Sequence, residues 1–223
     1  MVPERLDPAH TCLLLFDTLN GYLKTPGGVQ PEYRPAVANM QRLLDEARAA
    51  RLMVAYAIGS HRTDGGMAYT PLTDTDNRLQ PVSRRDWWRP KVVAGEWSGE
   101  IVSELAPRPE EFVVPKYRWS AFAGTYLDSA LRVHDVRTIV LAGGVTDIGI
   151  AATAFSAKDL DYDLVIPRDA CTASELDNHA QLMDRIFPRM ARVRTTDQVI
   201  AMLLGRDPAG LRLETEPRAH HRE

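Results

Sequence analysis

Two charged residues could do chemistry, and each comes directly after an apolar run. Asp17 follows Leu-Leu-Leu-Phe. A carboxylate at the end of a buried strand is partly desolvated, which raises its pKa and suits it to general acid or base catalysis. An aspartate there could equally do no more than cap the following turn. Lys116 follows the run 112–115 and precedes aromatic residues. It could pair with a carboxylate or polarise a substrate, although a single lysine is more often a solvated surface residue.

A glycine-rich stretch is the third candidate. Residues 142–149 read Ala-Gly-Gly-Val-Thr-Asp-Ile-Gly, between an apolar run and an alanine-rich helical pattern. Consecutive glycines let backbones approach closely, and the amides that open the next helix could bind an anion or an oxyanion. Tight packing of a helix on a sheet would use the same glycines. The spacing differs from Gly-x-Gly-x-x-Gly, which argues against a dinucleotide cofactor.

Short apolar runs alternate with helical periodicity along the chain, which is typical of a mostly parallel α/β sheet. The pattern predicts a three-layer α/β/α, doubly wound, mostly parallel six-stranded sheet. In such sheets ligands bind beyond the carboxyl ends of the strands, where all three candidates lie. The expected strands are 12–16, 52–58, 112–115, 138–141, 164–166 and 191–194. The expected helices are 35–51, 98–105, 125–134, 148–160, 174–190 (with Ser174 as its N-cap) and 196–204.

Composition sets the broad class. Of 223 residues, 44% are hydrophobic and 26% charged, which is ordinary for a globular protein. We expect one domain over 1–204 and a polar tail over 205–223. The formal charge of −3 argues against nucleic acid as a partner, and no apolar run approaches the ~20 residues of a membrane span. Two cysteines without metal-ligand spacing suit a reducing compartment, so we expect a cytoplasmic protein. We also expect a small-molecule substrate.

The polar stretch 59–90 lacks clear periodicity, so it is either a functional loop or poorly ordered. Within it His61, Arg62 and Trp88 could contact a substrate, since cations and aromatic faces suit an anionic ring compound. The alternative is a solvated loop whose tryptophans pack at a subunit interface.

Taken together, the motifs resemble the isochorismatase-like hydrolases, the cysteine hydrolase superfamily. The resemblance runs from Thr11 to Leu204 and covers the order and spacing of the segments. It implies Asp17 and Lys116 as catalytic residues, no cofactor, and a homo-oligomer. It also implies a substrate site that includes Gly144, Val145, Gly149, Trp119 and Phe122. The segments that carry it are Phe16-Asp17, Lys116-Tyr-Arg-Trp-Ser-Ala-Phe122, Gly143-Gly-Val-Thr-Asp-Ile-Gly149, Ala151-Ala-Thr-Ala154 and Asp169-Ala170.

The chain departs from the family pattern at one decisive position. Amidase members, such as nicotinamidases and carbamoylsarcosine amidases, carry a nucleophilic cysteine where this sequence has Gly149. Cys12 and Cys171 lie elsewhere, and Cys171 reads better as a small apolar filler. Ser60-His61-Arg62 does not reproduce the metal motif of nicotinamidases either, so we expect no catalytic metal.

Three functions stay open. Isochorismatases proper, which resemble this chain in having glycine at that position, hydrolyse a vinyl ether. By resemblance Asp17 would then donate the proton and Lys116 would be its partner, with the glycine leaving room for substrate if an open pocket lies there. Val145-Thr-Asp147 looks more like the amidases, which favours an amidase-like hydrolase or lyase using water activated by Asp17. The third possibility is a family member that only binds a ligand.

Overall fold

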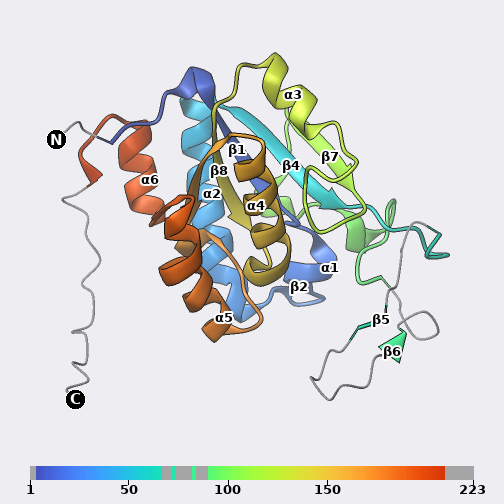
Figure 1. The fold of residues 1–223 in the computed structure, drawn as a ribbon. Helices are drawn as coiled ribbons and strands as arrows, with labels where there is room; N and C mark the ends of the chain where they lie inside the picture. Colours follow the sequence, from blue (N-terminus) through green and yellow to red (C-terminus); the bar gives the residue numbers. More distant parts are fainter. Residues whose placement is uncertain (1–3, 67–71, 74–81, 84–89, 209–223) are drawn as a thin grey trace, which may run out of the picture.

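The chain folds around a six-stranded parallel sheet, as the sequence predicts (Figure 1). This computed structural model describes residues 4–66, 72–73, 82–83 and 90–208. The strand order is β10-β9-β8-β1-β4-β7, so β1 lies inside the sheet with β8 and β4 on either side. The strands are β1 (Thr11–Phe16), β4 (Met53–Gly59), β7 (Phe112–Lys116), β8 (Thr138–Gly143), β9 (Asp163–Pro167) and β10 (Arg192–Arg194).

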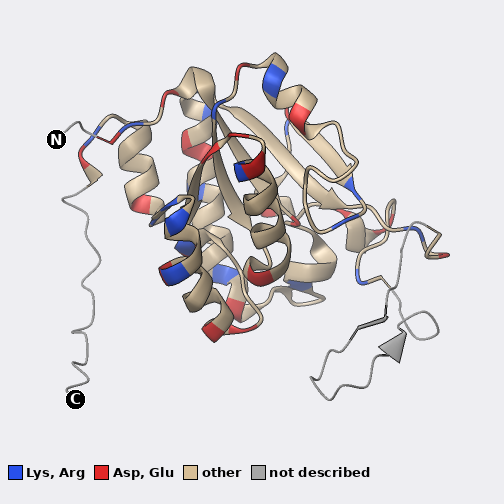
Figure 2. Cartoon of the chain, viewed as in Figure 1, with Lys and Arg blue, Asp and Glu red and all other residues tan. Residues whose placement is uncertain are grey.

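Helices cover both faces of the sheet, and successive residues of β1 point to opposite layers. Cys12, Leu14 and Phe16 pack into the cluster with α3 (Leu127–Val133) and α4 (Ala151–Asp159). Leu13 and Leu15 pack into the cluster with α2 (Arg34–Ala49) and α6 (Thr196–Leu203). Because all six residues of β1 are buried, its end has a fixed position in the core. Figure 2 shows charged residues on the outer helices and loops, around largely uncharged strands.

Two expected helices differ in the structure. The segment 98–105 forms only short 3₁₀ turns, Trp97–Gly99 and Ser103–Leu105. The backbone of this segment hydrogen-bonds instead to the chain that follows β1, since the N–H of Val102 donates to the carbonyl of Thr18 at 2.9 Å. The helix expected from Ser174 begins two residues later, as α5 (Leu176–Gln181). Glu175 is its N-cap residue, without a side-chain cap, so the predicted Ser174 cap is wrong.

The remaining elements are short. α1 (Asn20–Leu23) follows β1, and the two-residue strands form two antiparallel ribbons. Trp88 and most of the 59–90 loop lie outside the described residues, as does the tail beyond residue 208. The strands of the ribbons are β2 (Lys24–Thr25), β3 (Gly28–Val29), β5 (Leu72–Thr73) and β6 (Val82–Ser83); further 3₁₀ turns span Pro8–His10, Pro31–Tyr33, Arg168–Ala170 and Phe187–Arg189, and π-helical turns span Thr146–Ile150 and Leu182–Ile186.

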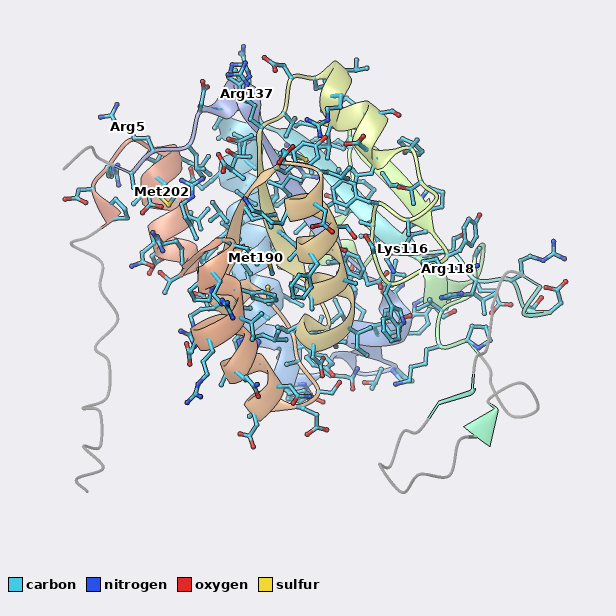
Figure 3. The ribbon with its side chains drawn as sticks, viewed as in Figure 1. Arg5, Lys116, Arg118, Arg137, Met190 and Met202 are labelled. Atoms are coloured by element: carbon cyan, nitrogen blue, oxygen red, sulfur yellow. The ribbon has the colours of Figure 1, made fainter. Side chains whose placement is uncertain are left out.

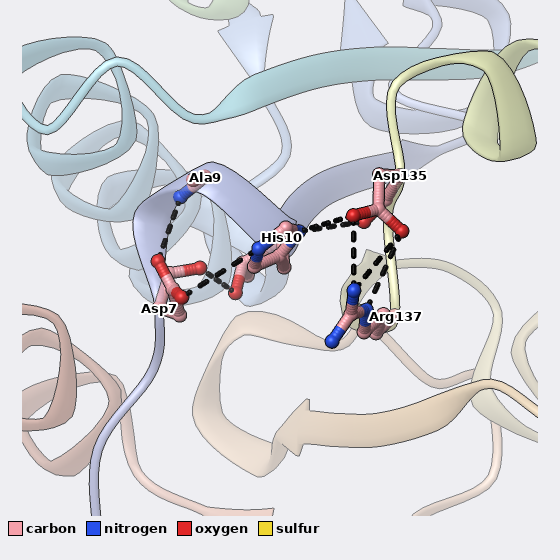
Figure 4. A network of polar contacts seen from close by, with 6 residues as sticks. Asp7, Ala9, His10, Asp135 and Arg137 are labelled. Atoms are coloured by element: carbon pink, nitrogen blue, oxygen red, sulfur yellow. Dashed lines mark hydrogen bonds and ion pairs between the residues drawn. The ribbon is translucent and has the colours of Figure 1, made fainter.

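Polar contacts fix the amino-terminal edge of the sheet. His10, just before β1, hydrogen-bonds through Nδ1 to the carbonyl of Asp135 at 2.9 Å, and Arg137 pairs with the Asp135 carboxylate at 3.0 Å (Figure 4). A cavity of about 590 Å³ lies beside this network, lined by Arg137, Thr138 and Asp163 among others. It opens at the edge opposite Asp17 and Lys116. None of the helices in the described ranges has both the length and the apolar composition that crossing a bilayer demands.

Candidate active site

Asp17 directly follows β1, and its carboxylate turns back toward the neighbouring strand β4. Its backbone N–H continues the ladder by donating to Ala57 at 2.8 Å. Its own φ of 50° then bends the chain out of the strand, a conformation that aspartate tolerates better than most residues. The bend brings Oδ1 to the backbone N–H of Gly59, which donates to it at 2.7 Å.

Lys116 reaches Asp17 across the intervening strand β4. The ammonium donates to Oδ2 of Asp17 at 2.8 Å, and the two side chains are 6% and 10% exposed. Two strand spacings separate their backbones by roughly 10 Å, and the long lysine side chain spans that gap over the end of β4. Gly59 is paired with Lys116 in register and carries no side chain there. A Cβ on Gly59 would lie 3.4 Å from Oδ1 of Asp17. Figure 3 shows Lys116 at the end of the sheet away from Arg137.

Burial dominates the electrostatics of this pair. Removal from water raises the pKa of Asp17 above its ordinary value, while the charge and hydrogen bond of Lys116 and the amide of Gly59 hold part of that rise back. A carboxyl whose protonated form persists to higher pH can deliver a proton as an acid. The same group in its ionised form can take a proton from water.

Two further polar side chains lie within electrostatic reach of the pair. Burial lowers the pKa of His61, and the nearby Lys116 lowers it further, so the imidazole stays neutral near pH 7. Burial raises the pKa of Tyr22, on α1, and the negative charge of Asp17 adds to the rise. The structure thus brings His61 to the site. It adds Tyr22, which sequence reasoning missed because no local pattern connects it to Asp17.

The glycine-rich turn packs against the end of β1. Gly143 has a φ of 121°, and a Cβ there would lie 2.1 Å from the carbonyl oxygen of Phe16. A Cβ on Gly144 would lie 1.7 Å from Oγ1 of Thr172. Close backbone approach is therefore what these two glycines provide. The Gly144–Val145 peptide bond is cis.

Several polar groups of the π-helical turn Thr146–Ile150 are hydrogen-bonded inside the protein. The N–H of Thr146 donates to the carbonyl of Thr172 at 2.9 Å, and that of Ile150 donates to Val145 at 3.2 Å. Oγ1 of Thr146 also donates to Thr172 and contacts Nδ1 of His179 at 2.8 Å. Backbone groups already bonded inside the protein are poor candidates for an oxyanion site, which applies here to the N–H groups of Thr146 and Ile150.

Position 149 faces the end of β1. An added Cβ at Gly149 would lie 2.1 Å from Cε1 of Phe16, far inside van der Waals contact. The space beside Gly149 is therefore filled by an aromatic ring. The room for substrate that the sequence suggested at this glycine is occupied by the protein itself.

The other expected site residues lie apart from the pair. Arg62 is paired with Asp64 through its Nε at 2.9 Å, and both side chains are exposed. Phe122 stacks on Tyr162 at 5.8 Å and packs against the buried cluster under α4. Trp119 is 70% exposed in the segment after β7. Phe122 thus has a packing role, and Trp119 lies on the surface.

Both cysteines are buried, and we expect neither to react in the folded protein. Burial raises the pKa of the Cys171 thiol to about 12, and that of Cys12 higher still. From an ordinary value of 9.0, a rise to about 12 lowers the thiolate fraction about a thousandfold. Iodoacetamide at pH 8, followed by mass spectrometry, should leave both thiols unmodified until urea is added. Rapid alkylation of Cys171 in the native protein would contradict this.

The described residues hold no group of three or more histidine, cysteine or acidic side chains placed to bind one metal ion. Their chemistry is concentrated instead in one buried acid and one buried cation, placed by β1 and β7, on either side of β4, at the carboxyl edge of a parallel sheet. General acid–base chemistry can use a buried acid beside a buried cation.

Comparison with known proteins places the chain in a family. The isochorismatase domain matches residues 11–198. The uncharacterized isochorismatase family protein YecD of Escherichia coli O157:H7 is 30% identical over 199 residues, covering 89% of this chain and 98% of that protein. An isochorismatase family protein of Burkholderia thailandensis has a similar structure, with a TM-score of 0.75, 31% identity and coverage of 91% of this chain and 99% of that one. A cysteine hydrolase of Pseudomonas syringae pv. phaseolicola superposes with a TM-score of 0.76 at 25% identity, over 92% and 98% of the two chains.

The chain belongs to the isochorismatase family. Members of this family are mostly hydrolases, and a hydrolase is the coarse assignment that fold and family support.

Proposed function

We propose that this protein is a hydrolase of a small, carboxylate-bearing molecule that works without a cysteine nucleophile. The observation that carries the proposal is the buried pair in which Lys116 donates to Asp17 at 2.8 Å. In this proposal Gly149 stands where amidases of the family have their nucleophilic cysteine. The Lys116 ammonium is the cation that an anionic substrate would meet beside the acid.

Vinyl-ether hydrolysis fits an acid of this kind. Asp17 in its protonated form gives its proton to the terminal carbon of the enol ether, which leaves an oxocarbenium ion. Water adds to that ion and returns a proton to the Asp17 carboxylate, and the resulting hemiketal breaks down to a ketone and an alcohol. Lys116 stays protonated throughout and stabilises the carboxylate that forms. No step needs a thiol.

A water-activating amidase is the second candidate, and the likeness to a cysteine hydrolase is the observation that favours it. In that reaction ionised Asp17 would take a proton from the attacking water. A product screen separates the two reactions. Carboxylate-bearing enol ethers should be turned over if the acid role holds, and primary amides or ureides if the base role holds. A family member that only binds ligands would turn over neither.

The pH profile gives an independent prediction. An acid role requires the protonated form of Asp17. Because burial raises the pKa of Asp17, kcat should then fall as pH rises through that raised pKa. A base role requires the ionised form, and kcat should instead rise over the same interval. Initial rates measured from pH 4 to 9 on the active substrate distinguish the signs. A rate that rises with pH would contradict the proposed acid chemistry.

We also propose that the active form is a homo-oligomer in the cytoplasm. Family resemblance supports the assembly, and the two free cysteines support the reducing compartment. Light scattering on the purified chain tests the first of these statements.

A further inference from the structure

The aromatic ring of Phe16 fills the space beside the Asp17–Lys116 pair. The Phe16 ring would meet any side chain at position 149, with Cε1 at 2.1 Å and Cζ at 2.6 Å from an added Cβ. The φ of Gly149 lies outside the left-handed region. An ordinary side chain would therefore suit its backbone, and the three nearest atoms that its Cβ would meet all belong to the ring. Phe16 is 1% exposed in the cluster with Leu14 and Ile150, so it has little room to move aside.

The same ring holds the catalytic lysine. The Lys116 ammonium lies 4.3 Å from the centroid of the Phe16 ring while it donates to Asp17. A cation within about 6 Å of an aromatic face is attracted by the ring quadrupole, more strongly where water is excluded. A lysine side chain has several rotatable bonds, and the ring face and the carboxylate together restrict it to one position.

We infer that Phe16 is the positioning residue and the specificity-determining residue of this site. Its ring fixes the ammonium of Lys116 against Asp17, and its volume keeps a protein nucleophile out of position 149. The inference rests on the proposed function and deepens it. With that space filled, the reaction depends on Asp17, Lys116 and water, so Phe16 commits the site to substrates that need no covalent intermediate.

A double-mutant cycle tests the exclusion without any substrate. Gly149→Cys should lower Tm by roughly 5 °C, because overpacking a rigid core is destabilising. Phe16→Val removes about the volume that the cysteine adds, so Phe16→Val/Gly149→Cys should recover most of the Tm lost by Gly149→Cys. If the losses of the two single variants simply add in the double variant, the ring does not fill this space and the inference is overturned. A Gly149→Cys variant with unchanged Tm would overturn it as well.

The new thiol then reports where Lys116 lies. In Phe16→Val/Gly149→Cys the hydrogen bond to Asp17 still holds the Lys116 ammonium, so the introduced sulfur should lie close to it, and a neighbouring cation lowers a thiol pKa. The two native thiols are buried and have raised pKa values, so alkylation above the wild-type background measures position 149 alone. Iodoacetamide rates against pH should show a midpoint at least one unit lower than in Phe16→Val/Gly149→Cys/Lys116→Met. Equal midpoints would show that Lys116 is not held at this space.

Turnover tests the positioning role. Phe16→Leu keeps an apolar filler but removes the ring face, so kcat should fall roughly fivefold to tenfold with little change in KM. The pH at which kcat falls should also move upward. A Lys116 that is held less firmly beside Asp17 lowers the pKa of that carboxyl by a smaller amount than in the wild-type enzyme. Phe187→Leu is the matched control, since Phe187 is fully buried in the same cluster and should leave that pH unchanged. A Phe16→Leu enzyme with the wild-type kcat and the wild-type pH dependence of kcat would refute the positioning role. Failure of the proposed function itself would appear elsewhere, as full turnover in Asp17→Asn while the Tm cycle and thiol titration still hold.

Discussion

Asp17→Asn should lower kcat by about a hundredfold to ten-thousandfold while the substrate still binds, because this range is what a positioned acid or base contributes. Asparagine keeps the size of the side chain and tolerates the φ of 50° found at this position. Its amide oxygen can still accept from Gly59 or Lys116, but it can neither deliver nor accept the transferred proton. Initial rates with the substrate found by the screen, together with calorimetric binding, separate turnover from affinity.

Asp135→Asn provides a closely matched control for that variant. Asp135 has the same φ of 50° and also pairs with a cation, Arg137, but both side chains are more than half exposed. Its substitution should leave kcat unchanged, so a rate loss confined to Asp17→Asn comes from the site and not from the bend in the backbone. Full turnover in a folded Asp17→Asn enzyme would reject Asp17 as the acid or base.

The sequence was sufficient to predict the six strands of the sheet, with their ends correct to within two residues. The run Leu-Leu-Leu-Phe before Asp17 is buried on both sides, and its alternation assigns Phe16 to the same face as Leu14. Sequence reasoning could not show that Lys116 reaches Asp17, because that contact depends on strand order. Strand β4 lies between them, and the backbone N–H of Gly59 at its end donates to Asp17.

Position 149 shows a different limit of the sequence. Glycine there predicts the absence of a side chain, but it does not say what occupies the space. That depends on where the ring of a residue more than a hundred positions earlier lies after folding, at 2.1 Å from an ideal Cβ. The segment after Trp97 carries a helical pattern, yet it forms only short 3₁₀ turns and hydrogen-bonds to the chain after β1. There tertiary contacts override local propensity.

Lys116→Met should destabilise the fold by about 3 to 5 kcal/mol at neutral pH, because it leaves the buried Asp17 carboxylate without its charge partner. Both side chains are largely excluded from water, so solvent does not screen the loss as it would on the surface. Methionine keeps most of the apolar length of lysine. The destabilisation therefore reports the lost ion pair more than a packing defect, and urea unfolding measures it.

The pH dependence of that loss identifies its cause. Lys116 lowers the pKa of Asp17 by charge and by hydrogen bond, so in Lys116→Met the pKa of Asp17 in the folded protein rises further above that in the unfolded chain. A raised folded pKa contributes stability below the unfolded pKa, and that stability is lost as pH rises through the folded value. The variant should thus approach wild-type stability near pH 4 and fall progressively toward pH 8. Asp17→Asn/Lys116→Met carries neither charge, so its free energy of unfolding should lack the fall between pH 4 and pH 8 that Lys116→Met shows. If Lys116→Met lowers the free energy of unfolding by the same amount at pH 4 and pH 8, the lysine stabilises the fold by packing alone. The proposed role of the buried ion pair in the site would then be rejected.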